Sequence, residues 1–218
     1  MSLLPQRVRS LVPASVRDSP RLRAAAVGAG LIPPRTMHSA GEAALLRRLA
    51  EGRRRVVEVG VYEGSSAVVL CDVLGPEAEL HLIDPFGHHP DALRPGWGAT
   101  EAATKRVVAR AARGPRGPKV VWHIAFSVPV AEAWAGGPVD LVFIDGDHSE
   151  AGVAADWAAW APLVEVGGCV MFHDARHGVP GGVGLPGPTA VVDRDVRTAP
   201  GWEVVDEVDA AVAVRRVA

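Results

Sequence analysis

The feature that most constrains the fold is a regular alternation of short apolar runs with longer helix patterns between residues 55 and 174. The runs that predict strands are 55–60, 79–84, 119–126, 139–147 and 167–174. The patterns that predict helices lie between them, at 65–75, 99–114, 128–137 and 149–164. Strands that alternate with helices of this length form βαβ units, so the sequence predicts an α/β fold with a parallel sheet.

The chain closes with two further strand-like runs, WEVVDEV at 202–208 and AAVAVRRV at 210–217. Their short separation predicts an antiparallel hairpin, which we expect at one edge of the sheet. A helix is expected over 189–198, after a long loop at 175–188 that holds five glycines and three prolines. An irregular insertion, 85–98, follows the second predicted strand.

The N-terminal region differs from the rest of the chain because five prolines interrupt residues 1–36. Short helices and turns are therefore expected there. A regular helix begins after Ser39, which can cap it, and ends at Gly52. We predict two parts, an N-terminal helical arm or lid at 1–38 and a domain at 39–218.

Composition limits the classes of partner. The 218 residues include 23 basic and 25 acidic side chains, a net charge of −2, which argues against binding nucleic acid through bulk electrostatics. No apolar stretch approaches the ~20 residues that cross a bilayer, and the N-terminus lacks the apolar core of a signal peptide. Cys71 and Cys169 lie in apolar runs and are expected to be buried free thiols. We expect a cytoplasmic protein that binds a small molecule and no membrane.

Ligands of an open parallel sheet bind beyond the carboxyl ends of its strands. A glycine loop follows the first predicted strand, with Glu58, Gly60, Gly64 and Ser65, and Asp84 ends the second. The glycines let the backbone turn sharply near a ligand, and an acid at Asp84 can accept hydrogen bonds from ribose hydroxyls. The alternative for Asp84 is a turn residue before Pro85. Glu58 lies in an apolar strand, so it either reaches the pocket or is satisfied by backbone donors of the loop.

Acids and histidines gather after the fourth and fifth predicted strands, whose ends should lie close together. These residues are Asp145, Asp147, His148, His173 and Asp174. Carboxylates and imidazoles can hold one divalent cation, which would lower the pKa of a bound hydroxyl. His148 could take the hydroxyl proton, since an ordinary imidazole titrates near ~6.5. The alternatives are that Asp147 caps the next helix and that His148 has no chemical role.

Aromatic and histidine residues elsewhere have weaker assignments. His88, His89 and Trp97 lie in the insertion and could line the pocket of the acceptor substrate, although exposed loop histidines are common. Trp157 and Trp160 lie on the helix after the fourth strand and are expected to pack in the core.

Four segments carry a resemblance to a known family: EVGVYEGSS, LIDPF, VDLVFIDGDHSEAGVAADWAAW and GGCVMFHD. Over about residues 40–215 the chain resembles the class I SAM-dependent methyltransferases, in particular the small bacterial methyltransferase family 24. It is similar to the macrocin-type and catechol-type O-methyltransferases. The resemblance implies a Rossmann-like, seven-stranded, mostly parallel sheet whose last strand is antiparallel.

The resemblance also implies roles for individual residues. S-adenosylmethionine (SAM) would be held by the glycine loop with Ser65, by Asp84, by Ser127 and by Asp145. A metal, Mg²⁺ or Mn²⁺, would be held by Asp145, His173 and Asp174. Two positions depart from the metal-dependent pattern: relatives often carry two acids, or Asp-Asn, at 173–174, and catechol-type relatives carry a lysine base at His148. A reaction without a metal is therefore the alternative.

These observations predict a SAM-dependent O-methyltransferase that acts on a hydroxyl of a small molecule, such as a sugar or phenol of a secondary metabolite. One alternative is an NAD-dependent oxidoreductase, although the chain lacks G-x-G-x-x-G. Another is a SAM-binding protein without catalysis. The N-terminal arm also offers a surface through which a homodimer could form.

Overall fold

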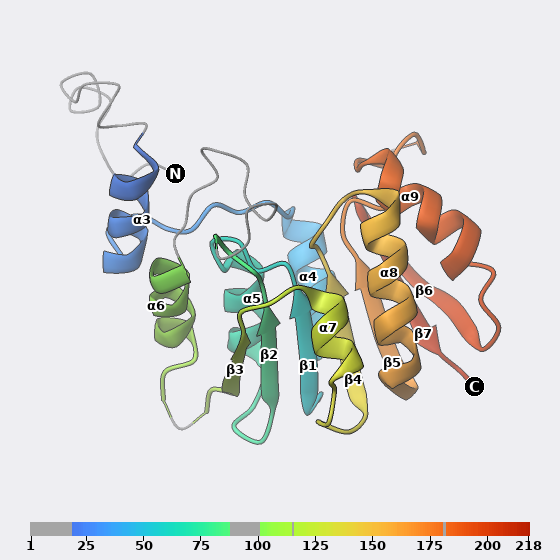
Figure 1. The fold of residues 1–218 in the computed structure, drawn as a ribbon, viewed down its shortest axis with the longest axis horizontal. Coiled ribbons are helices and arrows are strands. Elements are labelled where there is room, and N and C mark those ends of the chain that lie inside the picture. Colours follow the sequence, from blue (N-terminus) through green and yellow to red (C-terminus); the bar gives the residue numbers. More distant parts are fainter. Residues whose placement is uncertain (1–18, 88–100, 115, 181) are drawn as a thin grey trace.

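The computed structural model of the chain describes residues 19–87, 101–114, 116–180 and 182–218. Its centre is a seven-stranded sheet with the order β3-β2-β1-β4-β5-β7-β6 (Figure 1). The strands are β1 (Arg55–Val59), β2 (Glu79–Ile83), β3 (Lys119–His123), β4 (Val139–Ile144), β5 (Val164–Phe172), β6 (Trp202–Val208) and β7 (Ala211–Arg216). Only β7 runs antiparallel to its neighbours, so the predicted parallel sheet with a closing edge hairpin is confirmed.

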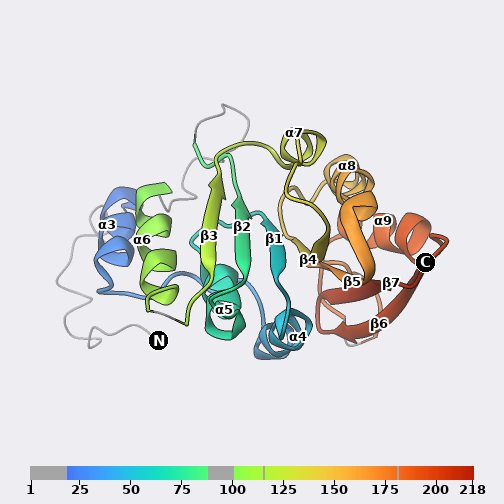
Figure 2. The ribbon, with the colours of Figure 1, turned by 90° about the horizontal axis from the view of Figure 1, so that it is seen from below.

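Helices cover both faces of the sheet (Figure 2). One face packs against α4 (Ala40–Ala50), α5 (Ser65–Val73) and α6 (Glu101–Ala111), and the other against α7 (Ser127–Glu132), α8 (Glu150–Trp160) and α9 (Pro186–Val191). The central strands β1 and β4 are buried on both faces, which explains why their sequences, apart from Glu58 and Asp140, are mostly apolar rather than alternating. The sheet thus separates two apolar cores.

Two helices begin where their side-chain caps predict. Ser39 accepts a hydrogen bond from the Glu42 amide and Glu42 accepts one from the Ser39 amide, a complete capping box at the start of α4. Ser149 accepts from the Gly152 amide at the start of α8. Because α8 begins at this point, the preceding residues 145–148 form a loop at the carboxyl end of β4.

The structure corrects several predicted boundaries. The helix expected over 128–137 ends at Glu132, and the strand expected over 167–174 runs from Val164 to Phe172. The helix expected over 149–164 ends at Trp160, because Pro162 belongs to a 3₁₀ turn (Ala161–Leu163) and β5 already begins at Val164. The helix expected over 189–198 starts earlier, as α9, and continues as a π-helix, Val192–Val196. The strand expected to reach residue 126 ends at His123.

Packing roles expected from the sequence are confirmed in the core. Trp160 is fully buried and makes an edge contact with Trp134, while Trp157 packs on Phe172 and Trp202. Cys71 and Cys169 are buried free thiols.

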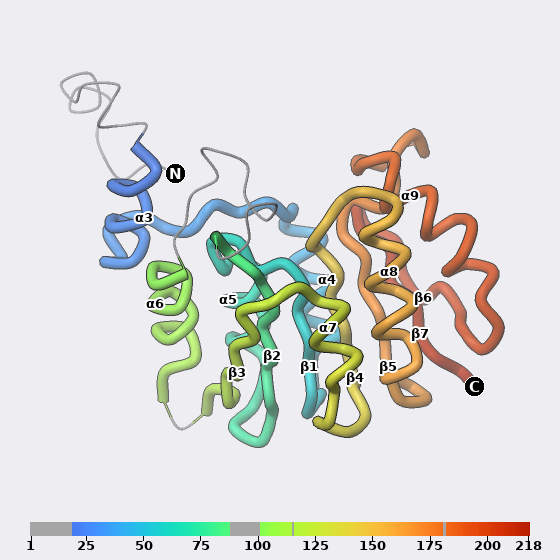
Figure 3. The backbone as a smooth tube through the Cα atoms, in the orientation of Figure 1, coloured from blue at the N-terminus to red at the C-terminus, as the bar shows by residue number. Residues whose placement is uncertain are grey.

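The N-terminal part that the structure describes contains the helix α3 (Pro20–Ala29), which packs against α6. From α3 the chain runs across the carboxyl ends of the central strands to α4 (Figure 3). None of the helices in the described ranges is long and apolar enough to cross a membrane.

Candidate active site

The glycine loop between β1 and α5 is packed tightly against other parts of the protein. Gly60 has φ +86°, and a Cβ on it would lie 2.1 Å from the carbonyl oxygen of Asp145. Gly64 has φ +84°, and its Cβ would lie 3.3 Å from side-chain carbons of Thr104 and Val108 on α6. We expected these glycines to let the backbone turn sharply near a ligand, and their contact with a ligand stays a prediction. The structure shows that the space beside each is filled by protein, so both glycines let elements of the fold approach one another.

Glu58 is a completely buried carboxyl group beneath this loop. One oxygen, Oε1, accepts a hydrogen bond from the hydroxyl of Ser66. The other, Oε2, is buried and has no hydrogen-bond partner among the described residues. Of the two expected arrangements, satisfaction by backbone donors is therefore wrong, because the donor is a side chain and one oxygen is left over. Burial raises the pKa of Glu58 to about 8; the Ser66 bond lowers it and the charges of Asp145 and Asp84 raise it further.

Asp84 braces the glycine loop from the end of β2. Its Oδ2 accepts hydrogen bonds from the amides of Val61 and Tyr62, both at 2.9 Å, and its Oδ1 accepts one from the amide of Phe86 at 2.6 Å. The carboxylate that we predicted to bind ribose thus shapes the loop as well. Its contact with ribose remains a prediction.

Two serines with predicted cofactor contacts also have structural positions. Ser65 is the first residue of α5. Ser127 is the first residue of α7, and its hydroxyl accepts a hydrogen bond of 2.7 Å from Nε1 of Trp160. The Ser127 hydroxyl therefore already serves the core as an acceptor.

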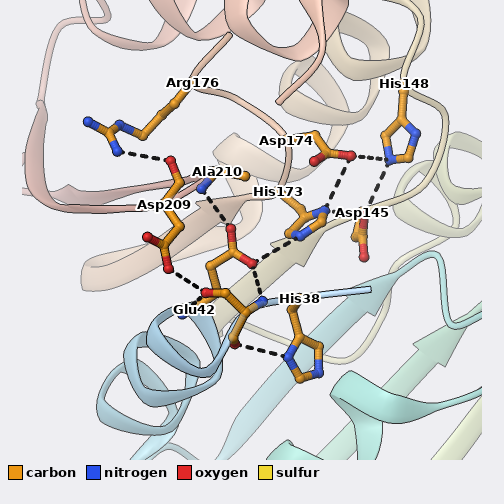
Figure 4. Close-up of polar contacts among 10 residues, drawn as sticks. His38, Glu42, Asp145, His148, His173, Asp174, Arg176, Asp209 and Ala210 are labelled. Atoms are coloured by element: carbon orange, nitrogen blue, oxygen red, sulfur yellow. Dashed lines mark hydrogen bonds and ion pairs between the residues drawn. The ribbon is translucent and has the colours of Figure 1, made fainter. Parts of the chain in front are cut away.

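A cluster of acids and histidines lies at the carboxyl ends of β4 and β5 (Figure 4). Oδ1 of Asp145 is 3.0 Å from Nδ1 of His173 and 3.3 Å from Nε2 of His148. Oδ2 of Asp174 is 3.5 Å from Nδ1 of His173 and 3.7 Å from Nε2 of His148. The sequence prediction that these four residues meet is confirmed. Asp147 instead accepts hydrogen bonds from the amide and hydroxyl of Ser149, so it holds the residue that caps α8 and does not cap the helix itself.

The charged groups of this cluster shift one another's pKa values. Burial disfavours a charged His173, but the carboxylates of Asp145, Asp174 and Glu42 outweigh burial and raise its pKa to about 12. Burial would raise the pKa of Asp145, yet the contacts with His148 and His173 lower it. The contact with Asp145 raises the pKa of His148. The cluster thus stabilises positive charge on imidazole between carboxylates.

Sequence reasoning missed Glu42, which reaches this cluster from α4. Its Oε2 lies 3.4 Å from Nε2 of His173 and accepts a hydrogen bond of 2.7 Å from the Ser39 amide, while Oε1 accepts one from the Ala210 amide. The pattern Ser39-x-x-Glu42 signals the capping box, but it contains nothing that points to His173. Glu42 therefore joins α4, the β6–β7 turn and the cluster.

Sequence reasoning also missed Glu63, a buried acid in the glycine loop. It forms a two-pronged ion pair with Arg23 of α3, with nitrogen–oxygen distances of 2.9 and 2.7 Å. No local pattern links the two residues, which are 40 positions apart. The predicted acceptor-site residues His88, His89 and Trp97 lie outside the described residues.

Comparison with known proteins decides the family. The model of methyltransferase family 24, described as a methyltransferase domain, matches residues 57–175, which contain both the glycine loop and the acid–histidine cluster. The chain belongs to this family. The methyltransferase activity predicted from the sequence is thereby confirmed, in preference to an NAD-dependent oxidoreductase.

Solved structures agree on the fold. The cofactor-bound protein Rv0187 from MTB is 20% identical, with a TM-score of 0.63 and 99% of both chains covered. The O-methyltransferase TomG from Streptomyces achromogenes, in complex with SAM, is 17% identical, with a TM-score of 0.59 and coverage of 92% of this chain and 90% of TomG. An O-methyltransferase from Bacillus cereus, in complex with SAH, is 17% identical, with a TM-score of 0.59 and coverage of 98% and 93%. The Rossmann-like methyltransferase fold expected from the sequence is confirmed.

Proposed function

We propose that this protein transfers a methyl group from SAM to a hydroxyl oxygen of a small molecule. The observation that carries the proposal is the contact between Gly60 and the backbone of Asp145, because it places the glycine loop and the acid–histidine cluster side by side at one edge of the sheet. A methyl donor in the loop would then lie next to an acceptor at the cluster. Positioning two reactants in this way is a major source of rate enhancement.

The donor side of the proposal depends on Oε2 of Glu58, which has no hydrogen-bond partner in the part of the chain that the structure describes. A buried carboxyl oxygen without a partner is costly, and the ammonium group of the methionine part of SAM is a donor that would satisfy it. SAM, once bound, supplies an electrophilic methyl group on a sulfonium. TomG and the Bacillus cereus enzyme, which share the fold, were solved with SAM and SAH.

The acceptor side depends on His148, whose side chain is one-third exposed and can meet a substrate. We propose that it takes the proton of the acceptor hydroxyl as the oxygen–methyl bond forms and the sulfur–methyl bond breaks. Asp145 orients the imidazole and stabilises the imidazolium, which is also the direction of its effect on the pKa of His148. The products are the methyl ether and S-adenosylhomocysteine.

A divalent cation is the second part of the proposal. Asp145, His148 and His173 each offer one ligand atom within 4.8 Å of the others, and Asp174 is adjacent. Two imidazoles and a carboxylate suit Mn²⁺ better than Mg²⁺, which prefers oxygen ligands. A cation there would orient the acceptor oxygen and lower its pKa. His148 cannot be ligand and base at once, so a metal held by His148 and a base at His148 are alternatives.

Titration calorimetry with SAM tests the donor side, with EDTA or with added Mg²⁺ or Mn²⁺. We expect SAM to bind in every condition, and absence of binding in all of them would overturn the proposal. Release of S-adenosylhomocysteine with a panel of phenols and sugars then tests the acceptor side. Turnover that EDTA leaves unchanged would overturn only the metal part and would support His148 as the base.

A further inference from the structure

The segment 19–39, which we call the strap, crosses the carboxyl edge of the sheet and is fixed at three places (Figure 3). At its start, α3 rests on α6, where Arg110 donates hydrogen bonds to the carbonyl oxygens of Val27 and Gly28. At its end, the hydroxyl of Ser39 donates to Asp209 in the β6–β7 turn. The third attachment, made by Arg23 and Arg35, is to the glycine loop.

Glu63 of the glycine loop is the acceptor in this third attachment, and its carboxylate is completely buried. Arg23 donates through Nε to Oε1 at 2.9 Å and through Nη2 to Oε2 at 2.7 Å. The Arg35 amide donates to Oε2 at 2.7 Å. These hydrogen bonds to a loop carboxylate all come from the strap. A buried charge that loses its partners is strongly destabilising, so the loop depends on the strap being docked.

The neighbouring residue, Tyr62, shows that the loop conformation itself requires external support. Its φ is +52°, a left-handed conformation that is strained for a residue other than glycine. Its amide donates to Asp84, its carbonyl accepts from Thr104 at 2.8 Å, and its hydroxyl accepts from Nη1 of Arg35 at 2.9 Å. The strap therefore holds two consecutive residues of the loop.

We propose that Arg23, Arg35 and Glu63 are positioning residues that couple docking of the strap to binding of SAM. This inference rests on the proposed function, since it takes SAM as the ligand of the glycine loop. With the strap docked, the loop has the shape that places Glu58 and the start of α5 toward the cofactor. Coupling between two binding events is reciprocal, so bound SAM must hold the strap in place by the same factor.

The direct test is the SAM dissociation constant of Arg23→Gln, measured by calorimetry beside the wild-type protein. We expect binding to weaken about tenfold, a typical coupling. Arg23→Lys keeps the charge with a single donor group and should recover part of the loss. The matched control is Arg47→Gln, because Arg47 makes an exposed ion pair of 3.5 Å with Asp72, away from the loop, and its loss should leave SAM binding unchanged.

A second measurement needs no variant. Trypsin can cut after Arg23, which lies within helix α3 and is held by Glu63, only when this part of the strap leaves its place, so saturating SAM should slow cuts at Arg23 several-fold in the wild-type protein. Mass spectrometry identifies the cuts, and cuts elsewhere in the chain serve as the reference. This measurement decides the matter if Arg23→Gln does not fold.

The outcomes are distinct. A wild-type protein that does not bind SAM overturns the proposed function, and the coupling with it. A wild-type protein that binds SAM overturns the coupling alone if folded Arg23→Gln binds SAM within twofold of it, or if SAM leaves the strap cuts unchanged. Weaker binding in Arg23→Gln, partial recovery in Arg23→Lys and SAM-dependent protection support it.

Discussion

The site has a cofactor half and an acceptor half, and the two differ in which groups pair with their charged side chains. In the cofactor half, the glycine loop and the end of β2, each acid has partners supplied by the fold: Ser66 for Glu58, the strap for Glu63, and loop amides for Asp84. In the acceptor half, Asp145, Asp174 and the two histidines face one another at 3.0–3.7 Å.

The two halves also differ in how far their side chains are exposed to solvent. Glu58 and Glu63 are completely buried, whereas the side chains of Asp145, His148 and Asp174 are 20–34% exposed. Groups whose partners are backbone amides or a partly buried arginine of another element cannot exchange them without local unfolding. Groups that pair with each other at the surface can turn toward a substrate or a cation. The cofactor half is therefore preorganised for one ligand, and the acceptor half is the part that can adapt.

The largest expected effect is a loss of turnover caused by a substitution in the acceptor half. Asp145→Asn removes the charge that stabilises an imidazolium at His148, so turnover should fall about a thousandfold, and the dissociation constant of SAM separates this role from the predicted contact of Asp145 with SAM. Steady-state kinetics and calorimetry measure the two. Asp147→Asn is the matched control, since Asp147 bonds to Ser149 outside the cluster and should keep near wild-type turnover. Equal loss in both variants would contradict the assignment.

The next largest effect concerns the contact between the two halves. Gly60→Ala places a methyl group 2.1 Å from the Asp145 carbonyl at a left-handed φ, so we expect the free energy of unfolding to fall by about 3 kcal/mol. Urea unfolding measures it. Gly75→Ala, with nothing within 4 Å of the added Cβ, should be close to neutral. A stable Gly60→Ala protein would show that the halves are not in the contact described.

In the cofactor half, Glu58 should make the free energy of unfolding depend on pH. The pKa of Glu58 is raised to about 8, so between about pH 5 and pH 8 the folded protein binds a proton that the unfolded chain has lost. This stability is fully present below the unfolded pKa and declines by about 1.4 kcal/mol per pH unit as pH rises toward 8. Glu58→Gln should remove that slope and also weaken SAM binding. Urea unfolding across this pH range tests it, and an unchanged slope would show that Glu58 does not titrate in this way.

The smallest expected effect concerns Ser127. Ser127→Ala leaves the buried Nε1 of Trp160 without its acceptor, which should cost about 1 kcal/mol of stability. A double-mutant cycle with Trp160→Phe isolates this pair. The same protein decides between the two roles of the serine: a loss of SAM affinity would support its predicted contact with the cofactor, and unchanged affinity would leave it a core residue.

Much of the fold could be predicted from local patterns. Apolar runs bounded by glycine and proline correctly placed all seven strands and the edge hairpin, because burial on both faces of a sheet needs continuous apolar sequence. Errors fell at boundaries such as Trp160 and Pro186, where helix, 3₁₀ and π turns have similar local cost. The meeting of Asp145 with His173 was also predictable, because the ends of adjacent parallel strands share one edge of the sheet.

By itself, then, the sequence determined the α/β architecture and the edge at which the reactive residues gather, since these follow from periodicity and strand ends, and its four motif segments carried the resemblance to the family. Only the tertiary structure decided which residues support them. Arg23 with Glu63, Glu42 with His173, and Gly60 with the Asp145 backbone are contacts between residues 40 to 131 positions apart. A buried charge or a missing Cβ has no local signature of its partner, because the partner is chosen by how the packed elements approach one another.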